Sequence, residues 1–235
     1  LGDVYKRQHY NDGTFRARPE WLRARIAYNV AKRASGSIVG GIFGVNPWSS
    51  PRGMLNKFLH PRDFRNAAMQ YGNENEDNAQ YSLEEIQTDR IINHEKRWFT
   101  AEEDNYDDMD KEFMLTNFEI SNMGLWTARE KPWRAMSPDG VLEETWTHPE
   151  TKQTKKVRSL IEYKCPYKIR NYPYSKTRNL YPVMPVEKTH NIVVPVPYQY
   201  YAQVQWGMQV MSSNGDGLLP PPRQQDKAWF CVWCP

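Results

Sequence analysis

Two short stretches of the chain hold the residues best suited to chemistry: SPDG at 137–140 and IEYKCPYK at 161–168. Asp139 lies in a Pro-Asp-Gly turn, whereas Glu162 and Lys164 lie two residues apart in an otherwise apolar segment that we interpret as a strand. Side chains two apart on a strand point to the same face, so Glu162 and Lys164 lie together. Burying a Glu and a Lys costs several kcal/mol unless they pair or bind something.

A metal ion would supply such a binding partner. Asp139 and Glu162, brought side by side, would offer two carboxylate oxygens, and the main-chain carbonyl of Tyr163 would add a third, a set that suits Mg²⁺. Lys164 would then orient or deprotonate a metal-bound water for attack on a phosphodiester. The same pattern also fits a surface hairpin with an exposed Glu and Lys, and the residues alone leave both interpretations open.

Charge is distributed unevenly along the chain, although the formal net charge is only +3. Residues 95–112 are acidic, whereas residues 152–178 combine Lys and Arg with several tyrosines. Basic residues interleaved with aromatic ones suit a phosphate backbone and exposed bases, and a solvated basic face is the alternative. The candidates for contact with a DNA backbone are Arg158, Lys168 and Arg170.

Composition narrows the class of protein. The chain has 235 residues, 39% of them hydrophobic, and no apolar run approaches the roughly 20 residues of a membrane helix. We therefore expect no membrane association. Three cysteines leave an odd thiol, which favours a reducing, intracellular compartment over secretion. Cys231 and Cys234 form a CxxC, but no second ligand pair has the spacing of a zinc site.

The pattern of elements predicts an α/β or α+β domain with a mixed central sheet. We expect helices at 21–32, 61–86 and 198–211, a short apolar element within 35–51, strands within 113–128, 133–147, 155–168 and 227–233, and a surface loop at 95–112. We expect a single domain over 21–235, with insertions near 88–112 and 168–197. It would follow a partly non-native tail at 1–20 and be truncated at its C-terminus.

Four motifs occur in a particular order: GNENEDNA at 72–79, SPDG, IEYKCP at 161–166 and YYAQVQWGM at 200–208. Together with SGSIVGGIFGVNPW at 35–48, this order resembles the YqaJ-like viral recombinase and alkaline exonuclease family, which includes phage lambda exonuclease. That family belongs to the PD-(D/E)xK nuclease superfamily. The resemblance implies a restriction-endonuclease-like core, in which helices flank a mixed central β-sheet.

The resemblance also implies roles for particular residues. Asp139, Glu162 and the Tyr163 carbonyl would bind the metal, Glu76 would complete the metal site from a helix, and Lys164 would be the catalytic lysine. Gln203, Gln205 and Tyr200 match a helix that borders the active site in the family. Ordinary solvated helix positions remain the alternative for Glu76 and for the two glutamines.

A 5′-phosphate site is implied as well. Ser37 matches the family serine that helps to hold this phosphate. Arg25 is the first candidate for its partner arginine, but the interval to Ser37 is longer than is usual in the family. Arg33 or Arg23 could therefore take the role instead.

The function expected from this resemblance is a Mg²⁺-dependent DNA exonuclease, with Mn²⁺ able to substitute. It would hydrolyse duplex DNA ends from 5′ to 3′, serve viral or phage recombination and replication, and work beside a single-strand annealing recombinase. The compartment would be a bacterial cytoplasm or a virus-infected cell.

Two other functions remain open: a structure-specific endonuclease of the same superfamily and a non-catalytic DNA-end-binding protein. A relative with an iron-sulfur cluster is disfavoured, because the cluster needs four cysteine ligands and this chain has three cysteines.

Overall fold

The computed structural model describes ten stretches of the chain. They are residues 7–9, 15–17, 36–44, 50–59, 66–100, 112–122, 124–128, 134–167, 198–213 and 228–233. The predicted helix at 21–32 and the predicted insertion at 168–197 lie outside these stretches. No helix in the described stretches has the length and apolarity needed to cross a membrane.

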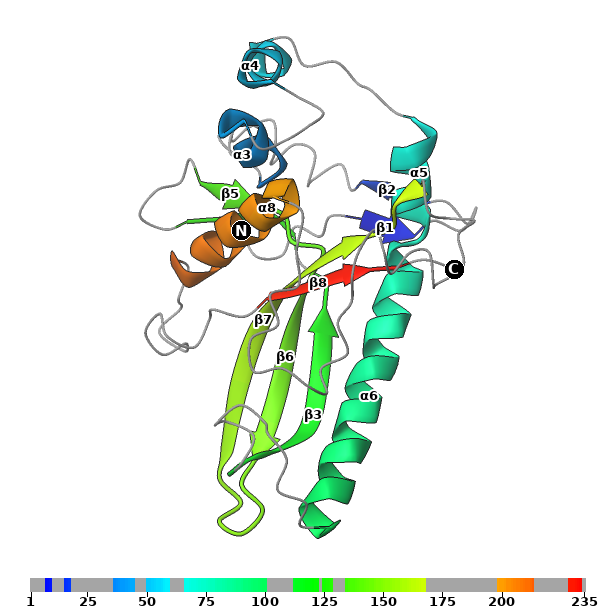
Figure 1. The fold of residues 1–235 in the computed structure, drawn as a ribbon, viewed down its shortest axis with the longest axis vertical. Coiled ribbons are helices and arrows are strands. Elements are labelled where there is room, and N and C mark those ends of the chain that lie inside the picture. Colours follow the sequence, from blue (N-terminus) through cyan, green and yellow to red (C-terminus); the bar gives the residue numbers. More distant parts are fainter. Residues whose placement is uncertain are drawn as a thin grey trace.

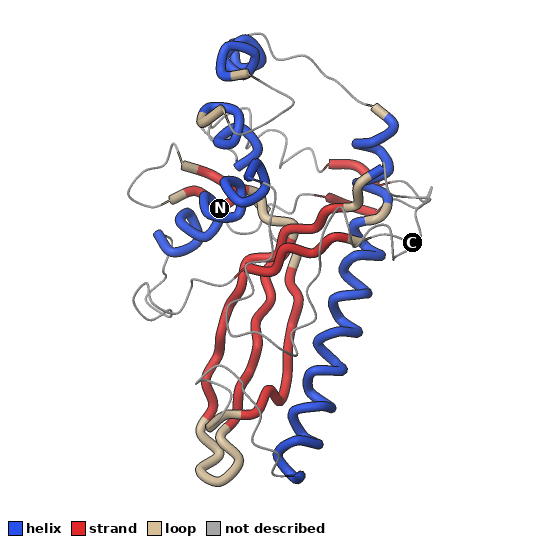
Figure 2. Tube along the Cα trace, viewed as in Figure 1, coloured by secondary structure: helices blue, strands red, loops and turns tan. Residues whose placement is uncertain are grey.

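A four-stranded sheet forms the centre of the fold (Figure 1). Its strands are β3 (Met114–Ser121), β6 (Gly140–Thr147), β7 (Thr154–Lys164) and β8 (Ala228–Val232), in the order β3-β6-β7-β8. The pairs β3/β6 and β6/β7 are antiparallel, whereas β7 and β8 run parallel. The β6–β7 connection projects beyond the strands as a loop at one end of the molecule (Figure 2). The sheet is therefore mixed, and with its flanking helices it confirms the predicted α+β class.

Helices α6 (Glu76–Thr100) and α8 (Tyr198–Ser213) pack on opposite faces of this sheet. Ile161 of β7 packs in one core cluster with Leu83 of α6. Its neighbour Leu160 packs in a second cluster with Val204 of α8. Adjacent residues of β7 thus pack in two separate core clusters, as the two-residue strand period requires.

Helix α6 runs beside β3 along the sheet (Figure 1). Ala79, Leu83 and Gln87 are buried at intervals of four residues, which is the spacing of one helix face. The helix continues through Thr100, so the predicted loop at 95–112 is wrong for residues 95–100. Neither Gly nor Pro occurs between residues 76 and 100, and nothing in the local sequence ends the helix earlier.

The helix predicted at 61–86 is interrupted. Asn75 alone separates α5 (Ala67–Glu74) from α6. Asn66 begins α5 as its N-cap, because its side-chain oxygen accepts a bond of 2.8 Å from the Met69 amide.

Two further helices precede α5. The short apolar element expected within 35–51 is α3 (Gly36–Ile42). Helix α4 (Pro51–Leu59) was not predicted, although its start has a helix signature: the Ser50 hydroxyl accepts a bond from the Gly53 amide, and Pro51 occupies the first turn.

Two small antiparallel pairs complete the fold. Strands β4 (Trp126–Thr127) and β5 (Ala135–Met136) pair beside α8, and β5 leads into the SPDG turn. Strands β1 (Arg7–His9) and β2 (Phe15–Ala17) pair within the stretch expected to be a tail.

Candidate active site

The site lies where β7 ends, on the face that α8 covers. The Glu162 side chain is 5% exposed and that of Lys164 is 20% exposed. The Lys164 ammonium donates to Glu162 Oε1 and also, over 3.1 Å, to the carbonyl oxygen of Tyr163. The strand period therefore places Glu162 and Lys164 on one face, as predicted, and the structure buries the pair rather than exposing it on a surface hairpin.

Helix α8 supplies a second donor to the same carboxylate. Gln203 Nε2 donates to Glu162 Oε1, the oxygen that Lys164 also contacts. A glycine permits this close approach one turn further along α8: a Cβ at Gly207 would lie 2.7 Å from a Leu160 methyl carbon. Glu162 is thus held by its own strand and by the helix packed over it.

Gln203 and Gln205, both predicted to border the site, differ in exposure. Gln203 is half-buried and reaches Glu162, whereas Gln205 is exposed. Two residues advance a helix by about 200°, so neighbours at this spacing face nearly opposite sides. The structure brings Gln203 to the carboxylate and leaves Gln205 on the outer side of α8.

Tyr200 forms one wall of the site. Its ring centroid lies 5.3 Å from Lys164 Nζ, within the range of a cation–π contact. Phe230 of β8 supports this ring at 5.4 Å between centroids. Sequence reasoning did not single out Phe230, because its place follows from the parallel pairing that sets it opposite Glu162. No residue spacing along the chain reveals that pairing.

Asp139 reaches the site from the turn before β6. Its Oδ2 accepts a bond of 3.0 Å from the Tyr163 amide, so this carboxylate lies beside the backbone between Glu162 and Lys164. Burial by itself would lower the pKa of Lys164, but the negative charges of Glu162 and Asp139 outweigh it and raise that pKa above its ordinary value. The two carboxylates therefore favour the cationic form of Lys164.

Glu76 is the first residue of α6, the helix that packs on the face of the sheet opposite α8. Burial raises the pKa of the Tyr163 phenol, and the charges of Asp139 and Glu76 are among the smaller contributions. Within the described stretches, however, no three His, Cys, Asp or Glu side chains form a group that could hold a metal ion. Asp139 accepts a bond from the amide of Tyr163, which directly follows Glu162. Glu76 does not join these two carboxylates in such a group.

The oxygens at the end of β7 suit a hard cation. Glu162 Oε1 and the Tyr163 carbonyl, two of the three predicted ligands, already converge on the Lys164 ammonium. The third, Asp139, is joined to the same stretch of backbone through the Tyr163 amide. Two carboxylates and a carbonyl fit Mg²⁺, which typically uses one or two carboxylates and retains several waters.

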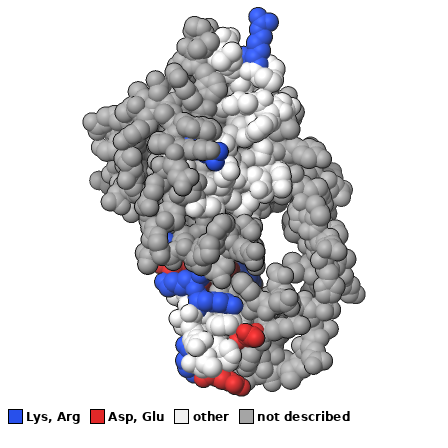
Figure 3. All heavy atoms as spheres, turned by 90° about the vertical axis from the view of Figure 1, so that its left-hand side faces the viewer, with Lys and Arg blue, Asp and Glu red and all other residues white. Residues whose placement is uncertain are grey.

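Of the residues predicted to contact the DNA backbone, Arg158 lies within the described stretches. Arg158 is engaged by Glu143: its Nε lies 2.6 Å from Oε2, and Lys156 Nζ lies 2.5 Å from Oε1 of the same carboxylate. In Figure 3, Lys and Arg side chains gather in the lower part of the molecule with Asp and Glu among them. The remaining basic candidates, Lys168, Arg170, Arg23, Arg25 and Arg33, lie outside the described residues.

Ser37 belongs to α3, which packs against α8. Its backbone is helical, and its side chain lies outside the described part of the chain. The helix that bears the predicted phosphate ligand therefore neighbours the helix that bears Gln203.

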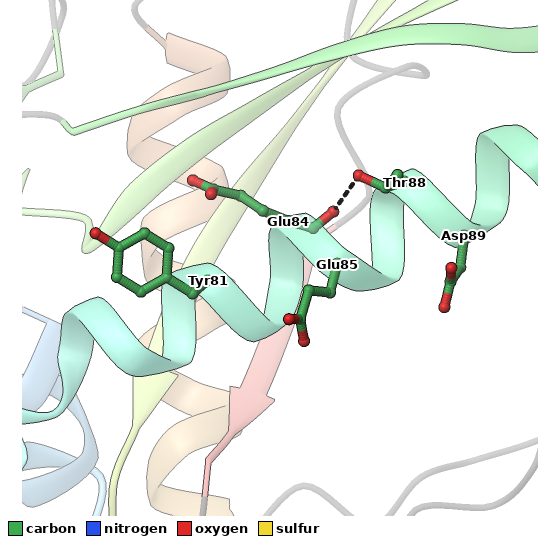
Figure 4. A pocket seen from close by; sticks show the side chains of 5 residues that line it. All are labelled: Tyr81, Glu84, Glu85, Thr88 and Asp89. Carbon is green, nitrogen blue, oxygen red and sulfur yellow. Dashed lines mark hydrogen bonds between the residues drawn. The ribbon is translucent and has the colours of Figure 1, made fainter.

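A separate hollow of about 410 Å³ lies along α6. Its lining consists of Tyr81, Glu84, Glu85, Thr88 and Asp89, all from this one helix (Figure 4). None of the predicted site residues lines it. The hollow is therefore separate from the candidate site at the end of β7.

Comparison with known proteins identifies the family of this chain. The YqaJ-like viral recombinase domain matches residues 20–214, which span all four motifs and the buried Glu162–Lys164 pair. A search among curated proteins found no match. The chain belongs to the YqaJ-like viral recombinase domain family, whose members are generally nuclease-like.

Proposed function

We propose that the chain is a Mg²⁺-dependent DNA exonuclease that hydrolyses duplex ends from 5′ to 3′. One observation carries the proposal: Glu162, buried in a strand of a nuclease-family chain, accepts bonds from both Lys164 and Gln203 beside a second carboxylate, Asp139. A buried carboxylate with two donors and an adjacent acid is costly to maintain, and metal-assisted hydrolysis gives it a use. Polarity and preference for ends rest on likeness to the family.

Each residue has a distinct part in this proposal. Asp139, Glu162 and the Tyr163 carbonyl hold the ion, and Mn²⁺ can replace Mg²⁺. The bound ion would lower the pKa of a coordinated water and offset charge on the phosphate. Glu76 adds negative charge near the site. Lys164 orients the attacking water, and Gln203 fixes the Glu162 carboxylate while the P–O bond breaks.

DNA would approach along α8 and the end of β7. Ser37 on α3, together with Arg25 or one of its neighbours, would hold the 5′ phosphate of the end. Arg158, Lys168 and Arg170 would follow the backbone, with Arg158 exchanging Glu143 for a phosphate. Such contacts weaken with salt through counterion release. The DNA ends would come from viral or phage recombination inside a host cell, beside a single-strand annealing recombinase.

The test is degradation of a linear duplex with 5′ phosphates, in Mg²⁺ and in EDTA, by the natural chain and by Lys164→Ala. A covalently closed circular duplex is the matched substrate without ends. We expect mononucleotides from the linear duplex alone, lost in EDTA and in Lys164→Ala. A 5′ label released before a 3′ label would support the direction.

Other outcomes would overturn specific parts. Cutting of the closed circle would make the protein an endonuclease. DNA-end binding without hydrolysis in Mg²⁺ or Mn²⁺ would make it an end-binding protein. Hydrolysis that persists in EDTA would exclude the metal-dependent reaction.

A further inference from the structure

Strand β8 lies beyond residue 214, where the match to the family ends, yet it borders the proposed site. It pairs in parallel with β7, and this register sets Phe230 opposite Glu162. The pairing continues just past the strand, because the Trp233 amide donates to the carbonyl oxygen of Lys164 over 2.9 Å. This part of the chain therefore fixes the backbone of Lys164 from one side.

Side chains from three elements meet on the face of the sheet that α8 covers. Lys164 Nζ lies over the Tyr200 ring, 5.3 Å from its centroid. The Tyr200 and Phe230 rings have centroids 5.4 Å apart and planes inclined by 33°. Both separations fall within the usual ranges of cation–π and aromatic contacts. Tyr200 is thus the common neighbour of the lysine ammonium and the phenyl ring.

Packing against α8 and β7 keeps Phe230 in place. Its half-buried side chain packs against the core cluster that contains Leu160 and Val204. Val204 follows Tyr200 by four residues, so these two side chains lie on one face of α8. Phe230 therefore supports the face of the helix that carries Tyr200.

We propose that Phe230 is a positioning residue for Lys164: it holds the Tyr200 ring against the lysine ammonium. This inference rests on the proposed function, in which Lys164 orients the attacking water. A lysine stem is flexible, and the two oxygens that accept from this ammonium, Glu162 Oε1 and the Tyr163 carbonyl, both belong to β7. The Tyr200 ring restrains the ammonium from the side of α8, and Phe230 needs no contact with substrate.

A role in packing alone makes a different prediction, because Phe230 also adds apolar surface to the cluster with Leu160 and Val204. Phe230→Leu keeps an apolar side chain and removes the ring, whereas Phe230→Tyr keeps the ring. Trp229→Leu is the matched control. Trp229 is the preceding residue of β8, is also half-buried, and lies beside Arg90 on the opposite face of the sheet.

The first measurement follows Lys164 in the absence of metal and DNA. The ring current of an aromatic face shifts nearby protons upfield, so the NMR spectrum of a protein with isotope-labelled lysine reports the contact with Tyr200. Loss of one signal in Lys164→Ala assigns it. We expect Phe230→Leu to move this signal towards that of an exposed lysine. Phe230→Tyr and Trp229→Leu should leave it near its natural position.

The second measurement separates kcat from KM in hydrolysis of the linear duplex. Phe230→Leu should lower kcat about fivefold, the size of one aromatic or cation–π contact, and change KM for DNA far less. Phe230→Tyr should recover most of that loss. Trp229→Leu should lower the melting temperature while the kcat per folded molecule is retained.

A double-mutant cycle with Tyr200→Leu completes the test. If Phe230 acts through Tyr200, adding Phe230→Leu to Tyr200→Leu should have little further effect on kcat or on the lysine signal. Three results would each overturn the inference and leave the proposed function intact: an unmoved lysine signal or unchanged kcat in Phe230→Leu, an equal loss of kcat in Trp229→Leu, or fully additive losses in the double variant. A natural chain that hydrolyses no DNA would overturn both.

Discussion

Two ion pairs with buried carboxylates differ in what surrounds them: one lies on β7, and the other joins β6 to α6. Glu162 pairs with Lys164, and Glu144 pairs with Arg90; each carboxylate side chain is 5% exposed. Arg90 also donates to Gln87 Oε1 over 2.6 Å, and two indole rings lie beside it, with centroids 5.9 Å away for Trp146 and 5.3 Å for Trp229. That guanidinium therefore ties α6 to the sheet.

The pair at the end of β7 has different neighbouring groups. Lys164 also donates to a main-chain carbonyl, and Gln203 donates to the same Glu162 oxygen. Asp139, from the turn before β6, accepts a bond from the amide of Tyr163, the residue after Glu162. The Arg90 pair offers one carboxylate among aromatic rings, whereas the Lys164 pair has a second carboxylate and a carbonyl oxygen beside it. Burial of an acid in a strand is therefore common to both pairs, and the second acid beside Glu162 distinguishes the proposed site.

The largest effect is expected from neutralising Glu162, the carboxylate of the proposed site. Glu162→Gln removes the charge that a metal ion would need, and we expect hydrolysis of the linear duplex to fall at least about hundredfold. The melting temperature should change far less than the rate. Initial rates in saturating Mg²⁺, with circular dichroism as the check on folding, decide the point. A rate within a few-fold of the natural chain would remove Glu162 from the mechanism.

The matched change in the other pair should act on stability. Glu144→Gln leaves Arg90 without its counter-charge, and we expect a loss of about 3 kcal/mol in the free energy of unfolding, at the low end for a broken buried pair because Arg90 is partly exposed. Urea denaturation measures it. The hydrolysis rate per folded molecule should be retained. Replacing both residues by Met should recover most of the loss; a variant that is stable but inactive would contradict the comparison.

A smaller effect is expected from the donor on α8. Gln203→Ala removes one of the donors to Glu162 Oε1, and we expect about a tenfold loss of kcat with a smaller change in KM for DNA. Gln209→Ala, an exposed glutamine of the same helix, provides the control. Equal effects of the two substitutions would show that Gln203 contributes only ordinary helix-surface polarity.

The exposed ion pairs of the β6–β7 hairpin should matter least. The hydrogen bond from Lys156, followed by burial acting in the opposite sense and by the bond from Arg158, leaves the pKa of Glu143 below its ordinary value of 4.5. A lowered folded pKa stabilises the fold at neutral pH, and this contribution disappears as the pH falls through the folded value.

Comparison of the natural chain with Glu143→Gln checks this sign. The natural chain should be more stable by about 1 kcal/mol or less at pH 7, and the difference should shrink as the pH falls below 4.5 and through the lowered pKa of Glu143. Urea denaturation at several pH values measures it. A difference that grows on acidification would contradict the assigned shift.

Local patterns predicted much of the site and the sheet. The two-residue strand period placed Glu162 and Lys164 on one face, and the Pro-Asp-Gly turn marked the start of β6. The order of strands and the final helix also matched. The interruption at Asn75 was not predicted, because its bonds to Tyr71 and Cys165 combine a local turn with a contact from a distant strand.

The sequence alone determined which residues could carry the chemistry, since periodicity and turn chemistry act over a few neighbouring positions. Only the tertiary structure brought Gln203 rather than Gln205 to the carboxylate, and only it set Phe230 opposite Glu162. These choices depend on the angle of α8 over β7 and on the parallel pairing of β8. Both arise from packing between segments far apart in the chain, which no local pattern encodes.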